Sequence, residues 1–194
     1  MGTLTAVVLA AGAGRRFGGP KALVRFRGRP LLDRAVALAD AAGCEECLVV
    51  LGADAESIAA RANVRAASVV VAPDWADGMG ASLRVGLDEA VRRGPRDVVV
   101  LLVDQPLIGP DAVIRLRRAL DGGAAVAVAS YDGQARNPVA FSASVLADVA
   151  RAVGGDRGAR DWLHAHPELV TEVECADTGD PSDIDTVDDL NRLS

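Results

Sequence analysis

Aromatic side chains are scarce in this chain of 194 residues: they make up 3% of it, although 50% of the residues are hydrophobic. Alanine, valine, leucine and glycine must therefore provide most of the packing, which is typical of α/β proteins whose helices lie close against a sheet. The length suits one domain, residues 1–194, with a sizeable buried core.

Long hydrophobic runs are also lacking. No apolar stretch approaches the roughly 18 residues that a membrane-spanning helix needs. The first 12 residues contain no basic residue ahead of an apolar stretch, so the sequence does not predict a secretory signal peptide. We therefore expect a soluble, cytoplasmic protein without a membrane partner.

Cysteine is rare, and the 3 cysteines give no obvious disulfide framework. Cys44 and Cys47 have the spacing of a metal-binding pair, but no second pair or nearby histidine completes four ligands. Buried thiols at the junction of a helix and a strand are the better interpretation.

A surplus of basic residues is missing too. The net charge of −6 argues against a nucleic-acid-binding surface, for which a basic face is expected. Against this acidic background, the segment 15–29 contains basic residues and no acid: Arg15, Arg16, Lys21, Arg25, Arg27 and Arg29. Such a local cluster suits a small anionic ligand.

Strand-like and helix-like segments alternate along the chain. Continuous apolar runs predict buried strands at 6–9, 47–51, 68–71, 98–103 and 124–129. Periodic patterns predict helices at 31–42, 54–62, 79–93 and 110–121, with start signals at Asp54 and Asp111. Further strands are expected at 136–141 and 169–174, and further helices at 144–153 and 158–165. The alternation predicts a three-layer, Rossmann-like α/β fold: a mostly parallel central sheet flanked by helices, with ligands beyond the carboxyl ends of the strands.

The loop after the first expected strand is the most informative segment. It holds Gly12, Gly14, Gly18 and Gly19 together with Arg15, Arg16 and Lys21. Glycines let backbone N–H groups approach a ligand closely, and fixed cations complete a cradle for a polyphosphate. The loop is not a Walker loop, because no Gly-Lys-Ser/Thr follows. A Rossmann dehydrogenase is the weaker interpretation, since Pro20 interrupts the dinucleotide fingerprint and no acid occurs between Thr3 and Asp33.

Two acidic positions are candidates for holding a divalent cation. Asp104 directly follows the apolar run 99–103, where a carboxylate loses solvation but can hold a hard cation beside phosphate oxygens. Capping of the next turn is the alternative role for Asp104. Asp185 lies in the acidic segment 183–189, which by itself is typical of a solvated helix start with Thr186 as N-cap.

Residues 9–21, from Leu9-Ala-Ala-Gly12 to Lys21, resemble the signature of the molybdenum cofactor nucleotidyltransferase family, and most closely its molybdopterin cytidylyltransferase branch. Further matching segments follow in the family's order: Pro73–Arg84, Asp104 after its strand, Gly154–Arg160 and Asp183–Leu190. The resemblance implies the nucleotidyltransferase form of the α/β fold.

The resemblance implies that residues 1–105 form a nucleotide-binding part. The implied nucleotide-binding positions are Leu9, Ala10, Ala11, Gly12, Lys21, Asp74 and Ser82. Arg16 and Lys21 are implied to hold the triphosphate as catalytic residues. Alanine at position 11, where guanylyltransferases usually have glycine, favours cytidine.

Residues 106–194 are implied to form an acceptor-binding part and a closing metal-binding segment. Asp104 is implied to be catalytic and to bind Mg²⁺ together with Asp185. The implied acceptor-binding positions are Asn137, Pro138, Asp156 and Arg160, of which Asn137 stands where the family often has histidine. Arg160 would bind a phosphate through a bidentate fork.

The implied reaction transfers CMP from CTP to the phosphate of molybdenum-bearing molybdopterin and releases pyrophosphate. No Ser-His-Asp or Cys-His arrangement is evident, which is consistent with direct displacement. Two alternatives stay open: transfer to another phosphorylated acceptor, such as a sugar phosphate, and a non-catalytic carrier of the cofactor for an oxidoreductase. The implied partners are CTP or another NTP, a phosphorylated pterin and, by transient docking, a molybdenum hydroxylase.

Overall fold

The computed structural model describes residues 2–193. Within this range one sheet has the strand order β5-β4-β1-β6-β8-β7-β9. Its strands are β1 (Leu4–Leu9), β4 (Glu46–Leu51), β5 (Ser68–Val71), β6 (Asp97–Leu102), β7 (Val126–Tyr131), β8 (Gln134–Phe141) and β9 (Val170–Glu174). Neighbouring strands pair in parallel except at β8, which is antiparallel to both β6 and β7. The predicted α/β fold with a mostly parallel sheet is confirmed.

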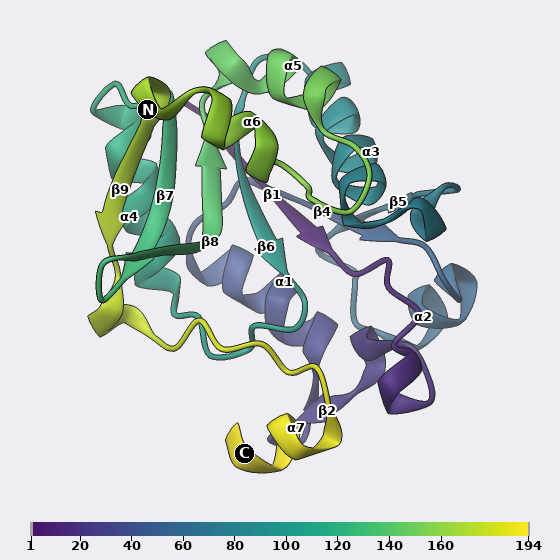
Figure 1. Ribbon diagram of the computed structural model, residues 1–194. Helices are drawn as coiled ribbons and strands as arrows, with labels where there is room; N and C mark the ends of the chain where they lie inside the picture. The colour runs from purple at the N-terminus through teal and green to yellow at the C-terminus, as the bar shows by residue number, and fades with distance from the viewer. Residues whose placement is uncertain (1, 194) are drawn as a thin grey trace.

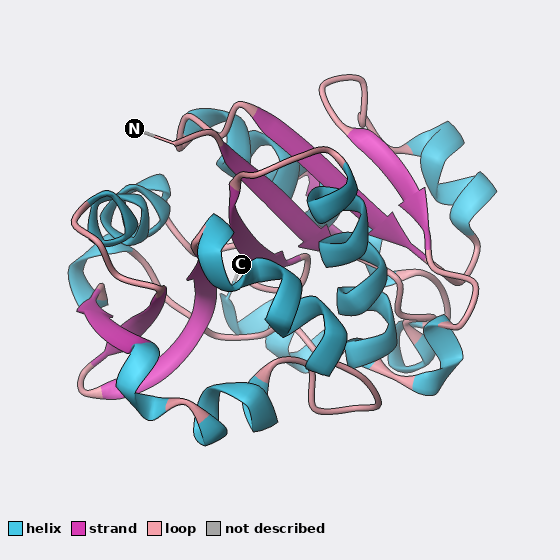
Figure 2. Ribbon diagram, turned by 90° about the horizontal axis from the view of Figure 1, so that it is seen from above, coloured by secondary structure: helices cyan, strands magenta, loops and turns pink. Residues whose placement is uncertain are grey.

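Helices cover both faces of this sheet, as Figure 1 and Figure 2 show. They are α1 (Leu31–Ala41), α2 (Ala55–Arg61), α3 (Met79–Arg92), α4 (Pro110–Asp121), α5 (Ala143–Ala152), α6 (Arg160–Ala165) and α7 (Val187–Leu193). Among residues 2–193, none of these helices combines the length and the apolar composition that a bilayer crossing requires.

Alternation along the strands divides the core into two layers. Ala6 and Val8 of β1 join the cluster on the side of α1 and α4, whereas Val7 and Leu9 join the cluster on the side of α3 and α5. Helix α3 lies very close to the sheet: a Cβ on Gly86 would stand 2.6 Å from Val7 Cγ1. Small residues therefore replace aromatic bulk, as the composition predicts.

Three sequence-based expectations need correction. Residues 68–71 form an edge strand rather than a buried one, because β5 has a neighbour on one side only and Val71 is 56% exposed. Strand β7 begins at Val126, not at 124, since Ala124 N still donates to Ala119 O at the end of α4. The side chain of Asp54 does not cap α2, although the helix begins at the next residue.

The structure also contains a short hairpin that was not predicted from the sequence. Its strands are β2 (Arg25–Phe26) and β3 (Arg29–Pro30), joined by Arg27 and Gly28 with φ values of 47° and 77°. A residue followed by glycine, both with positive φ, is the signal of a tight hairpin turn. In Figure 1 the hairpin lies beside α7, and Arg27 Nη2 donates to Leu193 O at 3.0 Å.

The cysteines are free thiols in the described chain. Cys47 is buried and Cys44 partly buried, and burial raises the pKa of each to about 12. The interpretation as packed thiols at a helix–strand junction is confirmed.

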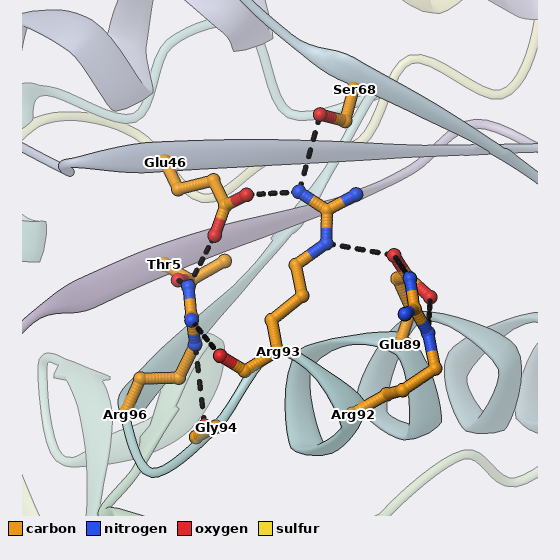
Figure 3. Close-up of polar contacts among 8 residues, drawn as sticks. All are labelled: Thr5, Glu46, Ser68, Glu89, Arg92, Arg93, Gly94 and Arg96. Atoms are coloured by element: carbon orange, nitrogen blue, oxygen red, sulfur yellow. Dashed lines mark hydrogen bonds and ion pairs between the residues drawn. The ribbon is translucent and has the colours of Figure 1, made fainter.

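A network of charged residues lies at the amino-terminal edge of the sheet (Figure 3). Glu46 lies between the guanidinium groups of Arg93 and Arg96, and Arg93 Nε also donates to Glu89 Oε1 at 2.7 Å. These ion pairs join β4 to the end of α3 and the segment before β6. They stabilise the edge opposite the candidate site.

Candidate active site

Three strands end together at the carboxyl edge of the sheet. Leu9 of β1 lies opposite Val50 of β4 and Leu102 of β6. The chain continues from β1 to β4 on one side and reaches β6 on the other, so this edge contains the topological switch point. In Figure 1 the arrowheads of β1 and β6 point to it.

The glycine loop leaves β1 at this edge and folds back on itself. Gly14 has a φ of 59°, and a Cβ there would stand 2.0 Å from Gly19 O. Only glycine fits this close approach. Phe17 N donates to Gly14 O at 2.8 Å, so the loop forms a short 3₁₀ turn at Arg15–Phe17 before a second one at Lys21–Leu23.

Lys21 lies between the two carboxylates proposed from the sequence. Its Nζ is 2.9 Å from Asp104 Oδ2 and 2.7 Å from Asp185 Oδ1. The Lys21 side chain is 17% exposed. Burial alone would lower its pKa, but attraction to Asp104 and hydrogen bonds to both carboxylates raise the pKa of Lys21 overall. The ammonium group therefore stays charged at neutral pH.

The segment before α7 crosses this edge and delivers Asp185. Ile184 is fully buried, and its N–H donates to Asp104 O at 2.8 Å. Gln105 Nε2 donates to Pro181 O at 3.0 Å. Thr186 caps α7 as the sequence predicts, because its Oγ1 accepts from Asp189 N while Asp189 Oδ2 accepts from Thr186 N.

The other residues predicted to bind the nucleotide differ in their exposure to solvent. Leu9, Ala10 and Ala11 are buried, and Ala53 N donates to Ala11 O. Gly12, Arg16 and Asp74 are exposed, and no residue within 2–193 pairs with the Arg16 guanidinium. Ser82 is buried in α3.

Two predicted segments that lie far apart in the sequence meet at the start of α3. Gly80 N donates to Gly155 O at 2.6 Å. A Cβ on Gly78 would stand 2.2 Å from Asp156 Oδ1. The loop 154–156 therefore closes against the amino end of α3 and brings Asp156 beside the segment 73–84.

A pocket of about 710 Å³ opens between the sheet, α3 and α6. Its floor is apolar, formed by side chains such as Leu102, Val139 and Phe141. Of the four residues predicted to bind the acceptor, Asn137 and Arg160 line this pocket. Pro138 is buried and does not line it, and neither does Asp156.

Several lining residues were not identified from the sequence. They are Gln105, Arg136, Arg157, His164, Glu172 and Asp183. Arg157 lies inside the matched segment Gly154–Arg160, so the sequence offered a signal for it. Arg136 and Asn137 reach the pocket at a place where the register of β7 and β8 shifts between Val128 and Ala129. A bulge of this kind re-aims side chains, and local sequence does not specify it.

A divalent cation would depend on two protein carboxylates here. Within residues 2–193 no three histidine, cysteine or acidic side chains gather as a metal cluster. Asp104 and Asp185 nevertheless place one oxygen each against a single cation, the Lys21 ammonium. This donor set fits Mg²⁺, which takes one or two carboxylates and completes its shell with water and substrate phosphates.

An α/β sheet whose switch point carries a glycine loop, a lysine and two carboxylates defines a protein of the nucleotidyltransferase type. The chain belongs to the family of MobA-like NTP transferase domains, whose model matches residues 6–170. Asp185 lies beyond the matched range.

Two similar proteins have names that denote different activities. The chain is 39% identical to nicotine blue oxidoreductase of Paenarthrobacter nicotinovorans, over 98% of this chain and 96% of that protein. It is 35% identical to the bifunctional protein GlmU of Xanthobacter autotrophicus over 67% of this chain, but spans only 30% of that protein.

Solved structures agree with the fold. Rv0371c from Mycobacterium tuberculosis H37Rv is 32% identical and superposes with a TM-score of 0.82, covering 99% of this chain and 97% of that one. A structure of the Rv0371c complex with manganese is 31% identical, with a TM-score of 0.81, covering 98% of this chain and 97% of that one. A divalent metal therefore occurs in a structure similar to this one.

Proposed function

We propose that this protein is a Mg²⁺-dependent nucleotidyltransferase that moves CMP from CTP to the phosphate of a molybdenum-bearing pterin and releases pyrophosphate. The observation that supports this most directly is the meeting of Lys21, Asp104 and Asp185 at the end of β1 and β6. A structural ion pair would need one carboxylate; the second is explained by a site built for cations and phosphates together.

Arg16 and Lys21 would hold the triphosphate in this reaction. The exposed Arg16 is free to reach a ligand above the glycine loop, and the backbone of the loop would contribute N–H donors. Asp104 and Asp185 would hold Mg²⁺, which neutralises charge on the phosphates during transfer. Catalysis is then positioning and electrostatic stabilisation, and no covalent nucleophile on the protein is needed.

The pocket of about 710 Å³ would receive the acceptor. Its volume lies within the usual ~300–1,000 Å³ of small-molecule sites. The apolar floor suits a flat ring system, while Arg160 would pair with the acceptor's phosphate and Asn137 would hydrogen-bond its ring. In this proposal residues 1–105 bind the nucleotide and residues 106–194 bind the acceptor and complete the metal site.

Pyrophosphate release in the presence of Mg²⁺, each NTP and a phosphorylated pterin tests the proposal. We expect CTP to be preferred, and Asp104→Asn to lower turnover about 100-fold or more. Asp111→Asn, which removes an exposed acid from the first turn of α4, is the matched control and should retain activity. Undiminished turnover of Asp104→Asn would refute the metal assignment. Activity only with a sugar phosphate would keep the class and change the acceptor.

An oxidoreductase is the second candidate function, because the relative that is 39% identical over nearly the whole chain carries that name. Such a reaction needs an electron donor, and a nicotinamide nucleotide is the chemistry that a polyphosphate-binding loop could hold. Oxidation of NADH or NADPH that depends on an added organic acceptor such as nicotine blue, the compound in that relative's name, would favour it over transfer if no NTP releases pyrophosphate; the hydride would pass from the nicotinamide to the acceptor, which is reduced. Failure to bind either nicotinamide nucleotide would exclude a nicotinamide-dependent oxidoreductase.

A further inference from the structure

A second, smaller pocket lies between α1 and the turn that follows β6. Its volume is about 210 Å³, and its wall includes Arg29, Arg34, Gln105 and Pro106. Among the described residues, none that lines it is acidic. Leu102 and Gln105 line the larger pocket as well, so these two residues lie between the pockets.

The arginines of this pocket lack acidic partners. Arg34 Nη2 donates to Pro106 O at 3.3 Å, but Arg34 Nε is buried without a hydrogen-bond partner. Arg29 is exposed, and no residue of the described chain pairs with its guanidinium group. The neighbouring acid Asp33 is engaged elsewhere, because its Oδ1 accepts from Asn63 N at 2.9 Å. A buried donor without a partner is costly, and native proteins rarely leave one.

Like charges gather around Arg34. Burial, and then the nearby charges of Arg27 and Arg29, lower the pKa of Arg34. The guanidinium groups of Arg27 and Arg34 each lie over the Phe26 ring, at 4.9 Å and 5.1 Å from its centroid. The aromatic contacts hold these cations in place but do not neutralise them. A bound anion would relieve the repulsion.

We propose that this pocket binds a small phosphate-type oxyanion, orthophosphate or pyrophosphate, through Arg29 and Arg34. The volume is about seven times the ~30 Å³ that one water occupies in the liquid, and it lies below the ~300 Å³ of ordinary small-molecule sites. A small anion with some water fits, whereas a nucleotide does not. The planar guanidinium group matches phosphate oxygens in a bidentate way. The site is separate from the glycine loop and does not depend on the proposed reaction.

The anion site contacts the turn that carries Asp104. Two hydrogen bonds of this turn are long: Gln105 N to Leu102 O and Ile108 N to Gln105 O, each 3.4 Å. An anion held by Arg34, which also donates to Pro106 O, would order this turn. The amide protons of Gln105, Leu107 and Ile108 should therefore exchange more slowly when the anion is bound; residue 106 is proline and carries none.

Hydrogen exchange of the full chain without divalent metal, with orthophosphate or with pyrophosphate, tests the proposal. We expect slower exchange at 105–108 and in the first turn of α1, with one or both anions. Arg29→Ala and Arg34→Gln should each raise the anion concentration needed for half-maximal protection about tenfold or more. Arg61→Ala, which removes an exposed cation at the end of α2, is the control and should leave the concentration dependence unchanged.

Each outcome bears on the proposal. Protection by pyrophosphate alone, or by orthophosphate alone, supports the site and identifies the anion. Protection confined to 12–21 in the wild type would mean that the anion binds only at the glycine loop, and would overturn the inference. Retention of the effect at 105–108 in both arginine variants would overturn it as well. Arg29 is exposed, so its variant keeps the test valid if Arg34→Gln unfolds. NTP binding at the glycine loop, measured separately, reports on the proposed function.

Discussion

Replacing Lys21 by methionine removes the ammonium group while keeping a side chain of similar length. In the wild type this group contacts Asp104 at 2.9 Å and Asp185 at 2.7 Å. The Asp104 contact is well shielded and should contribute about 1–2 kcal/mol, as charge-assisted hydrogen bonds do. The Asp185 side chain is 49% exposed, so solvent reduces its contribution to below about 1 kcal/mol.

We therefore expect Lys21→Met to lose about 2 kcal/mol of unfolding free energy at neutral pH. For a domain of this size that corresponds to a fall in Tm of about 4–8 °C. The loss arises because two neighbouring carboxylates remain without a cation.

The same variant should respond more strongly to divalent metal. The wild-type ammonium group occupies the carboxylate oxygens that a cation would use, so Mg²⁺ must compete with it in the absence of nucleotide. We expect Mg²⁺ or Mn²⁺ to raise the Tm of Lys21→Met more than that of the wild type, while CTP binding weakens. Asp185→Asn, which lacks one carboxylate, should show the smallest response to metal.

Thermal unfolding and calorimetric titration with metal, each without nucleotide, measure these effects. Arg61→Met is the control, since it removes an exposed cation without a charged partner in the described chain. Equal metal responses in Lys21→Met and the wild type would refute the idea that Lys21 and the metal share the same oxygens. An unchanged Tm would refute the stabilising role of the pair.

Three further predictions concern stability and the glycine loop. Hydrogen bonds from Arg92 and Arg93 lower the pKa of Glu89 from 4.5 to about 2. The Glu89 carboxylate therefore contributes to the free energy of unfolding above pH 4.5, and this contribution is lost as the pH falls toward 2. In urea unfolding at different pH values, Glu89→Gln should reduce the pH-dependent part of the unfolding free energy by about 1 kcal/mol. Gly86→Ala should cost about 1–3 kcal/mol by overpacking, whereas Gly154→Ala, whose Cβ would meet nothing within 4 Å, should be nearly neutral in the same assay. Gly14→Ala should weaken CTP binding at least tenfold in calorimetry, because the Cβ collides with the loop backbone; unchanged binding would mean that the loop conformation is not needed.

The order and type of the elements could be predicted from local pattern. Valine-rich runs followed by amphipathic stretches specify strands and helices, because side-chain period and backbone geometry are coupled within a few residues. The edge position of β5 could not be predicted this way. Three valines follow Ser68 in this strand, and such a run looks the same in a central strand and in an edge strand. Only the strand order distinguishes the two.

The candidate site also has parts that local sequence predicts and parts that depend on the tertiary structure. Residue types and their neighbours pointed to the glycine loop, Lys21 and Asp104 as candidates for phosphate and cation binding, whereas Asp185 was predicted only because the segment 183–190 resembles the family's closing motif. That Lys21 contacts both carboxylates, across separations of 83 and 164 residues, was decided by the tertiary structure. Parallel strands end at one edge, and the buried Ile184 fixes the last segment against that edge. The tertiary structure also determined the two pockets. One depends on the bulge at which Asn137 reaches the larger pocket, and the other on the packing of α1 against the turn at Gln105. Both arise from contacts between distant segments, which no local pattern encodes.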